Sequence, residues 1–311
     1  MLFRYLVCIL CTLFEVGKAA QIDSSKIYEP NPPVTHRAFF TIEYTDRTTS
    51  QVKELDLTIE LYGTVVPKTV ENFAKLTKGV TAVIRGTDEE NDRFQLGYKD
   101  TKFHRIVPDF IIQGGDVLPD VGPFNIFGKQ YFEDENFQLK HDRPGRLSMA
   151  NLDKPDSNAS QFFIVTSLEP QTHLDAKHVV FGQVVSGLDE LIKEVQYVEV
   201  DEQHKPLADV KLIYTLVEEL QISGAEDLHK QWLDQAEKFQ HGDMSQGVSM
   251  ATTLATGKKE EAIMKEVLFE QLHHPAVKVA SGMVLLLVIY LIVRKTRIFS
   301  KNTKIVSMRH D

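Results

Sequence analysis

The feature that most constrains the fold is segment 103–116, where a long apolar run is interrupted by two polar side chains. Its sequence, FHRIVPDFIIQGGD, combines strand-forming residues with Arg105, Gln113 and a Gly-Gly turn. An arginine is costly to bury even partly unless its donors have partners or a function. The segment therefore predicts strands that present a guanidinium group and an amide beside an aromatic ring.

The composition of the 311 residues is that of an ordinary globular protein, for which one or two domains are expected. The net charge of −9 argues against nucleic-acid binding, which needs a basic surface. Both cysteines, Cys8 and Cys11, fall in the first apolar run, so cysteine usage does not indicate a compartment. The adjacent pair His273-His274 lacks the spacing of metal ligands, and we expect no metal site.

Both ends of the chain carry apolar segments. Residues 1–20 have a basic start, an apolar centre and small residues, which predicts a signal peptide cleaved after Ala19 rather than an uncleaved anchor. Residues 276–293 are predicted to form a transmembrane helix rather than a buried core helix, because 279–293 contains no charge and is apolar on every face, with Lys278 near its start. The basic segment 294–311 then predicts a cytosolic tail. We therefore expect a single-pass protein of the secretory-pathway membrane (ER, Golgi or vacuole) with its bulk in the lumen.

Between these ends the sequence divides into three parts. Residues 21–34 contain three prolines and are predicted to form an extended linker. Residues 35–221 contain many short alternating segments and two helix signals, one opening at Pro67 and one over 187–195. This pattern favours a mainly β domain, a closed antiparallel barrel with helices over its ends. Residues 222–275 lose the alternation, which predicts a partly helical stalk.

Three further motifs follow segment 103–116: GRLSMAN at 145–151, NASQFFI at 158–164 and LDAKHVVFG at 174–182. In this order the four motifs resemble those of the cyclophilins, the cyclosporin-type peptidyl-prolyl isomerases, and in particular the fungal cyclophilins of the secretory pathway. The resemblance runs from about residue 39 to residue 217. It implies a closed eight-stranded antiparallel barrel capped by two helices.

The resemblance also implies roles for the motif residues. Arg105 would donate a hydrogen bond to the prolyl nitrogen, and Gln113 would orient Arg105 and the substrate backbone. The other substrate-binding residues would be His104, Phe110, Ile111, Ala150, Asn151, Gln161, Phe163, His173, Leu174 and His178. Any one of the apolar residues could be ordinary core on its own, and Arg105 could be a structural ion-pair partner. Four motifs in the family's order favour a site.

Prolyl isomerisation makes few chemical demands. The peptide C–N bond resists rotation by ~18–20 kcal/mol, because the nitrogen lone pair is conjugated with the carbonyl group. In the twisted state that lone pair can accept a hydrogen bond. A donor above an apolar pocket that holds the proline ring therefore lowers the barrier. Such a reaction requires no nucleophile, metal or cofactor.

Three positions modify this expectation. Ile111 stands where the family usually has Met, a change that keeps the volume but stiffens the side chain and is expected to alter substrate preference. His173 stands where many members have Trp, which implies that cyclosporin binding is weakened while the catalytic set is kept. Asn158 begins a glycosylation sequon, but the sequon overlaps a family motif, and a folded strand edge would hide the asparagine.

The sequence thus predicts a peptidyl-prolyl cis-trans isomerase that acts on proline-containing polypeptides and assists protein folding in the secretory pathway. One alternative is a non-catalytic proline-peptide receptor or escort that uses the same groove. Another is a scaffold in which the stalk, 222–275, makes the interactions and the barrel is passive.

Overall fold

The computed structural model describes residues 21–83, 93–273, 290–292 and 294. Contacts divide the chain into two compact units, Met1–Lys259 and Glu260–Asp311. The sheet, the helices that cover it and the candidate site all belong to the first unit.

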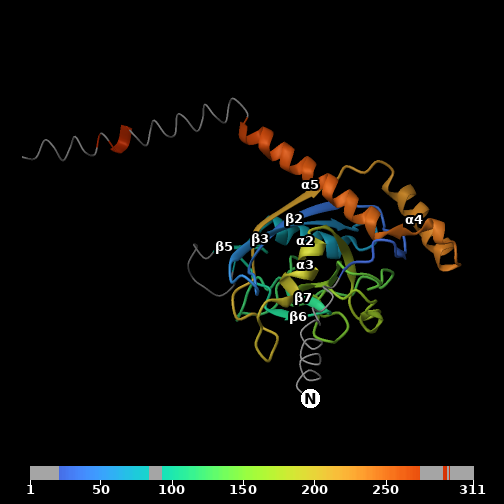
Figure 1. The fold of residues 1–311 in the computed structure, drawn as a ribbon, viewed down its shortest axis with the longest axis horizontal. Helices are drawn as coiled ribbons and strands as arrows, with labels where there is room; N and C mark the ends of the chain where they lie inside the picture. Colours follow the sequence, from blue (N-terminus) through green and yellow to red (C-terminus); the bar gives the residue numbers. More distant parts are fainter. Residues whose placement is uncertain (1–20, 84–92, 274–289, 293, 295–311) are drawn as a thin grey trace, which may run out of the picture. The chain divides into compact units, whose positions relative to one another are not determined.

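Eight antiparallel strands form the main sheet in the order β11-β2-β3-β10-β8-β9-β7-β6. Figure 1 labels β2, β3, β6 and β7 of this sheet. The long strands β2 (His36–Thr45) and β3 (Val52–Leu61) pair over their whole length, because their alternating apolar residues face one core. The remaining strands are β6 (Arg105–Val107), β7 (Ile111–Gly114), β8 (Arg146–Met149), β9 (Phe162–Val165), β10 (Val180–Ser186) and β11 (Lys211–Glu219). A separate hairpin joins β4 (Val80–Val83) and β5 (Arg93–Leu96).

The predicted closed barrel is wrong, because the end strands of the sheet, β11 and β6, do not pair along their length. Among the described residues, the only β-bridge between these edges joins Lys102, which precedes β6, to Lys211. β6 has three residues and ends before Pro108, which has no N–H for a ladder. Ile106 donates instead to the carbonyl oxygen of His204 in a loop, at 2.8 Å. The sheet is a curled, open half-barrel.

Helices α2 (Pro67–Lys78) and α3 (Leu188–Lys193) contribute apolar residues to the core. α2 begins at Pro67, where a missing N–H costs no hydrogen bond. It ends before Gly79, whose φ of +85° is a conformation that glycine adopts without strain. Two short 3₁₀ helices, η1 (Thr172–Leu174) and η2 (Val195–Tyr197), complete the covering elements.

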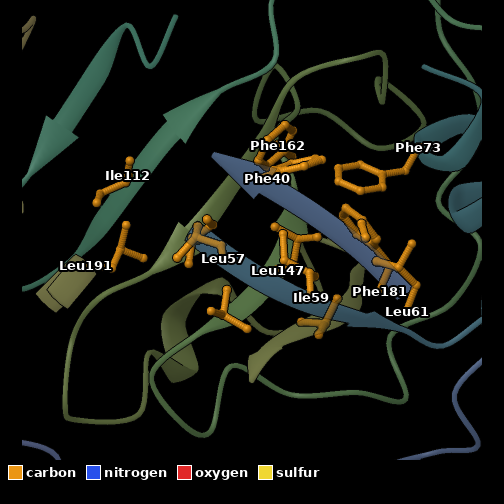
Figure 2. Packing of buried hydrophobic residues seen from close by; sticks show 14 of the residues in the cluster. Phe40, Leu57, Ile59, Leu61, Phe73, Ile112, Leu147, Phe162, Phe181 and Leu191 are labelled. Atoms are coloured by element: carbon orange, nitrogen blue, oxygen red, sulfur yellow. The ribbon is translucent and has the colours of Figure 1, made fainter. Parts of the chain in front are cut away.

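Aromatic rings from α2 and three strands meet in the core (Figure 2). The centre of the Phe73 ring lies 5.2 Å from that of Phe162 on β9 and 5.0 Å from that of Phe181 on β10. The Phe40 ring on β2 lies 5.8 Å from Phe73. Such ring contacts add to the free energy of burial. Phe73 therefore joins α2 to both halves of the sheet.

The segments that precede and follow the sheet in the sequence pack against each other. β1 (Ile27–Tyr28) pairs with β12 (Val248–Ser249). α4 (Ala225–Gln240) buries Trp232, whose Nε1 donates to the carbonyl oxygen of Pro30 at 3.0 Å. η3 (Met244–Gln246) and α5 (Met250–His273) follow. The linker at 21–34 and the first part of the 222–275 segment are thus in contact within the folded unit.

The predicted fold also included a transmembrane helix at 276–293, and this part is corrected. No helix within the described ranges has the length and apolar character needed to cross a bilayer. Of the predicted span, only residues 290–292 are described. The predicted signal peptide, 1–20, and all but the first residue of the predicted tail also lie outside the described residues.

Replacing Phe73 with Ala is expected to lower the free energy of unfolding by about 3–5 kcal/mol, because it leaves a cavity among several rings. Chemical denaturation followed by circular dichroism measures the loss. The matched control is Leu207→Ala, in an exposed side chain, which should change the free energy by less than about 0.5 kcal/mol. Equally small changes in both variants would contradict the packing around Phe73.

Candidate active site

The two predicted catalytic residues lie on a row that crosses four strands. Arg105 is the register partner of Gln113, Gln113 that of Phe163, and Phe163 that of Ser148. Directly paired residues of neighbouring strands point to the same side of a sheet, so these four side chains share a face. Ile112, the neighbour of Gln113, belongs to the core on the opposite face (Figure 2). The alternation in segment 103–116 therefore separates the site from the core.

The Arg105 guanidinium lies beside two amide side chains. Its Nη1 is 3.5 Å from Gln113 Oε1, and Gln113 Nε2 donates to Gln161 Oε1 at 3.2 Å. Arg105 is half-buried. Within the part of the chain that the structure describes, it forms no ion pair with an acidic side chain. Donors of this permanently charged group therefore remain available to a ligand.

An apolar cluster separate from the main core lies on this face, next to the row. Its buried members are Ile111, Ala150, Phe163, Val165 and Leu174, and Phe110 packs half-buried against them. Phe163 belongs both to the cluster and to the row that contains Arg105. The arrangement places an apolar surface for a small ring beside a strong hydrogen-bond donor.

Two predicted histidines contact the rings of this cluster. His173 is exposed and stacks on Phe110, with ring centres 5.5 Å apart. His178 meets Phe163 edge-on at 5.3 Å, and its Nδ1 lies 3.0 Å from a backbone carbonyl oxygen of Met149. Burial lowers the pKa of His178, so the neutral ring is favoured. Both side chains lie where they can border a bound peptide.

Other residues of the predicted site line two cavities, one of which also includes Ala150 of the apolar cluster. Ala150, Asn151 and Gln161 line one of about 360 Å³, and His104 and Arg105 line another of about 920 Å³. Burial lowers the pKa of His104. Ala150, Asn151 and Gln161 of the predicted site thus share one cavity, whereas His104 and Arg105 line the other.

The amide of Asn151 is partly engaged within the protein. Its Nδ2 donates to the carbonyl oxygen of Lys177 at 2.7 Å, and its Oδ1 accepts from the N–H of Asp153 at 3.1 Å. These bonds fix the segment after β8, so the backbone of Asn151 is better placed than its side chain to meet a peptide.

The sequon asparagine is not presented for modification in the folded chain. Asn158 has 0% of its surface exposed, and its Nδ2 donates to Asp134 Oδ1 at 2.7 Å. Glycosylation requires an accessible amide nitrogen. This geometry agrees with the expectation that a folded strand edge hides the asparagine.

One residue of the site, His141, was missed by sequence reasoning. Its ring stacks on Phe163 at 5.9 Å with an interplanar angle of 16°. Its Nδ1 lies 2.9 Å from Asp175 Oδ1, and its Nε2 lies 2.9 Å from Ser148 Oγ. His141 lies just outside the second motif, in a charged run that is typical of an exposed loop. Nothing in the sequence alone indicated that its ring is buried.

Comparison with known proteins identifies the family. The model of the family described as "Cyclophilin type peptidyl-prolyl cis-trans isomerase/CLD" matches residues 44–217. The chain is 50% identical over 237 residues to peptidyl-prolyl cis-trans isomerase CPR4 of Saccharomyces cerevisiae, which covers 76% of this chain and 74% of that protein. It is 33% identical over 294 residues to peptidyl-prolyl cis-trans isomerase CYP8 of the same organism, covering 93% and 89%.

The chain therefore belongs to the cyclophilin family and is a peptidyl-prolyl cis-trans isomerase. The predictions of this family and of this enzyme class are confirmed.

The free energy of unfolding is expected to fall as the pH drops below 6.5. Burial lowers the pKa of His141 below its ordinary 6.5, against the opposing effect of Asp175. Between the lowered pKa and pH 6.5, the unfolded chain binds a proton that the folded protein does not. The contribution of the neutral His141 ring to the free energy of unfolding is therefore complete above pH 6.5 and is lost as the pH falls through the lowered pKa. Denaturant titrations at several pH values measure the slope. His141→Asn should make it shallower, and an unchanged slope would contradict this origin.

Proposed function

We propose that Arg105 donates a hydrogen bond to the prolyl nitrogen of the twisted peptide bond, while the apolar cluster holds the proline ring. The observation that supports this is the shared face of Arg105 and Phe163, two strands apart in a continuous register. The absence of an acidic partner for Arg105 among the described residues leaves its donors for a ligand. The position fits catalysis better than structural ion pairing.

The proposed mechanism requires only the Arg105 donor and the apolar cluster that holds the proline ring. Uncatalysed X-Pro isomerisation takes tens to hundreds of seconds, because the planar amide must lose its conjugation. Rotation localises the lone pair on nitrogen, so a hydrogen bond to that nitrogen is strong only near the transition state. A preorganised charged donor in a partly desolvated site can lower the barrier by several kcal/mol, on the order of 3. The ring must stay fixed while the acyl side turns.

The amides beside Arg105 have a supporting role in this proposal. Gln113 accepts from Arg105 and donates to Gln161, so the pair restricts the guanidinium to one side of the pocket. Ile111, Phe163 and Leu174 hold the proline ring through apolar contact. Residues flanking the proline would run past Ala150 and Asn151, which line the adjoining cavity.

Arg105→Ala is expected to lower kcat/KM for a proline tetrapeptide by about a hundredfold, since it removes the only transition-state donor in the proposal. A protease-coupled isomerisation assay measures this. Arg47→Ala, which removes an exposed arginine in a turn away from this face, is the matched control and should retain wild-type activity.

Equal rates for wild type and Arg105→Ala would remove Arg105 from the mechanism. Calorimetric titration with a non-cleavable proline peptide separates the roles further. The variant should keep its affinity within a few-fold, on the order of threefold, because the apolar cluster is intact. Tight binding by wild type without isomerisation would favour a receptor or escort.

We also propose that the enzyme acts in the secretory pathway, where it would assist folding of proline-containing polypeptides. The support is the pattern of residues 1–20, a basic start and an apolar centre followed by small residues, which is typical of a signal peptide. In a eukaryotic host, N-terminal sequencing should find a mature chain that begins at Ala20. A chain lacking residues 1–19 is the control and should stay in the cytosolic fraction. Recovery of the full chain beginning at Met1 would contradict the proposal.

A further inference from the structure

Two buried arginines lie between the site and the terminal segments. Arg143 and Arg146 have 0% and 1% of their surfaces exposed. Both pair with Asp142: Arg143 Nη2 is 2.6 Å from Oδ2 and Arg146 Nε is 2.9 Å from Oδ1. Burial raises the pKa of Asp142, but the two guanidinium groups lower it to about 2, so the carboxylate stays charged. One carboxylate cannot serve two buried guanidinium groups, and other partners are needed.

The N-terminal segment supplies these partners. Arg143 Nη2 donates to the carbonyl oxygen of Glu29 at 2.6 Å, and its guanidinium carbon lies 4.7 Å from the centre of the Tyr28 ring. Asn31 Oδ1 accepts from Nη1 of Arg143 at 3.3 Å and from Nη1 of Arg146 at 3.4 Å. The end of the Arg143 side chain is therefore enclosed by residues 28–31.

Residues 232–251, which follow the sheet in the sequence, hold residues 24–31 against Arg143. Trp232 on α4 donates to the carbonyl oxygen of Pro30, and Gln240 Nε2 donates to Glu29 Oε1 at 2.7 Å. The β1–β12 pair adds a short ladder, and the N–H of Ala251 donates to the carbonyl oxygen of Ser24 at 3.1 Å. We call residues 24–31 together with 232–251 the terminal clasp.

The terminal clasp reaches the proline pocket through three consecutive residues. Arg143 is joined through Asp142 to Arg146, the first residue of β8. The same short segment begins with His141, whose ring stacks on Phe163. His141 is also tied to Ser148, further along β8. The path from the clasp to the Phe163 ring therefore runs through the hydrogen bonds of Arg143 and Asp142 and then along the backbone from Asp142 to His141.

We propose that Arg143 is a positioning residue of the isomerase: the terminal clasp fixes Arg143, and Arg143 in turn holds His141 against Phe163 in the proline pocket. Arg143 touches no substrate, so it acts through His141. The C-terminal extension is then a determinant of how tightly the pocket holds proline. This inference rests on the proposed role of the Phe163 cluster.

The proposal predicts a specific kinetic effect. The donor Arg105 is held by Gln113 and Gln161, which have no contact with the terminal clasp among the described hydrogen bonds. Loosening the clasp should therefore weaken the hold on the proline ring and raise KM, while kcat is largely kept. A variant that merely lost stability would contain less active enzyme, which lowers the apparent kcat and leaves KM unchanged.

The test uses the full chain with Arg143→Lys and Asn31→Ala, in the isomerase assay with a proline tetrapeptide. Each should raise KM about fivefold and change kcat by less than about twofold. Asn31→Ala keeps the test valid if the arginine variant does not fold, because it removes one hydrogen-bond acceptor and leaves Arg143 in place. Lys75→Ala is the matched control: it breaks an exposed ion pair of α2 with Glu71, outside the clasp, and should leave both constants unchanged.

Trp232 is the sole tryptophan of the chain and lies in the terminal clasp, so its emission reports directly on that structure. Both variants should shift the emission to longer wavelength without peptide, since the ring becomes more exposed. A wild-type KM in both variants overturns the proposal, as does a lower kcat with unchanged KM. Failure of Arg105→Ala to lose activity would instead refute the catalytic proposal and would leave the KM comparison intact, so the two failures are distinguishable.

Discussion

The active site depends on the antiparallel register of β6, β7, β9 and β8. A shift of one residue in β7 would send Gln113 into the core and Ile112 to the surface, because side chains alternate strictly between faces. The burial of Ile112 and of its partner Ile164 therefore opposes such a shift. Core packing on one side of the sheet thus determines the distance between the guanidinium of Arg105 and the ring of Phe163 on the other. This is why four short strands are enough to hold a site.

Much of the candidate site could be predicted from the sequence because its residues fall in four motifs whose order resembles that of the cyclophilins. The alternation within segment 103–116 is enough to indicate which of its residues share a face. Closure of the barrel could not be predicted in this way, since it depends on how far β6 extends toward β11, and β6 stops after three residues. The burial of His141 and Trp232 could not be predicted from the sequence either. Each depends on partners far away in the chain, such as Pro30 for Trp232, and such contacts leave no periodic signal.

The two departures from the family pattern differ in their physical consequences. Ile111 is buried in the apolar cluster, where a β-branched side chain has fewer rotamers than the usual methionine and adapts less to different rings. His173 is exposed, so its effect is confined to the rim, where it stacks on Phe110. The buried side chain at position 111 is expected to affect which rings bind, whereas the exposed side chain at position 173 is expected to affect only larger ligands. Neither residue belongs to the row of register partners that contains Arg105.

Arg105 and Phe163 are held in place by different parts of the protein. Arg105 is restrained by neighbouring amides within the sheet, through Gln113 and Gln161. Phe163 is supported by the stacked ring of His141, and behind it by buried charges that require the terminal segments for their hydrogen bonds. Because a buried guanidinium without partners is so costly, residues 28–31 cannot leave Arg143 without a large loss of stability. The segments 24–31 and 232–251 are therefore held in place by the hydrogen-bonding requirement of Arg143, which lies two residues from His141, the ring that stacks on Phe163.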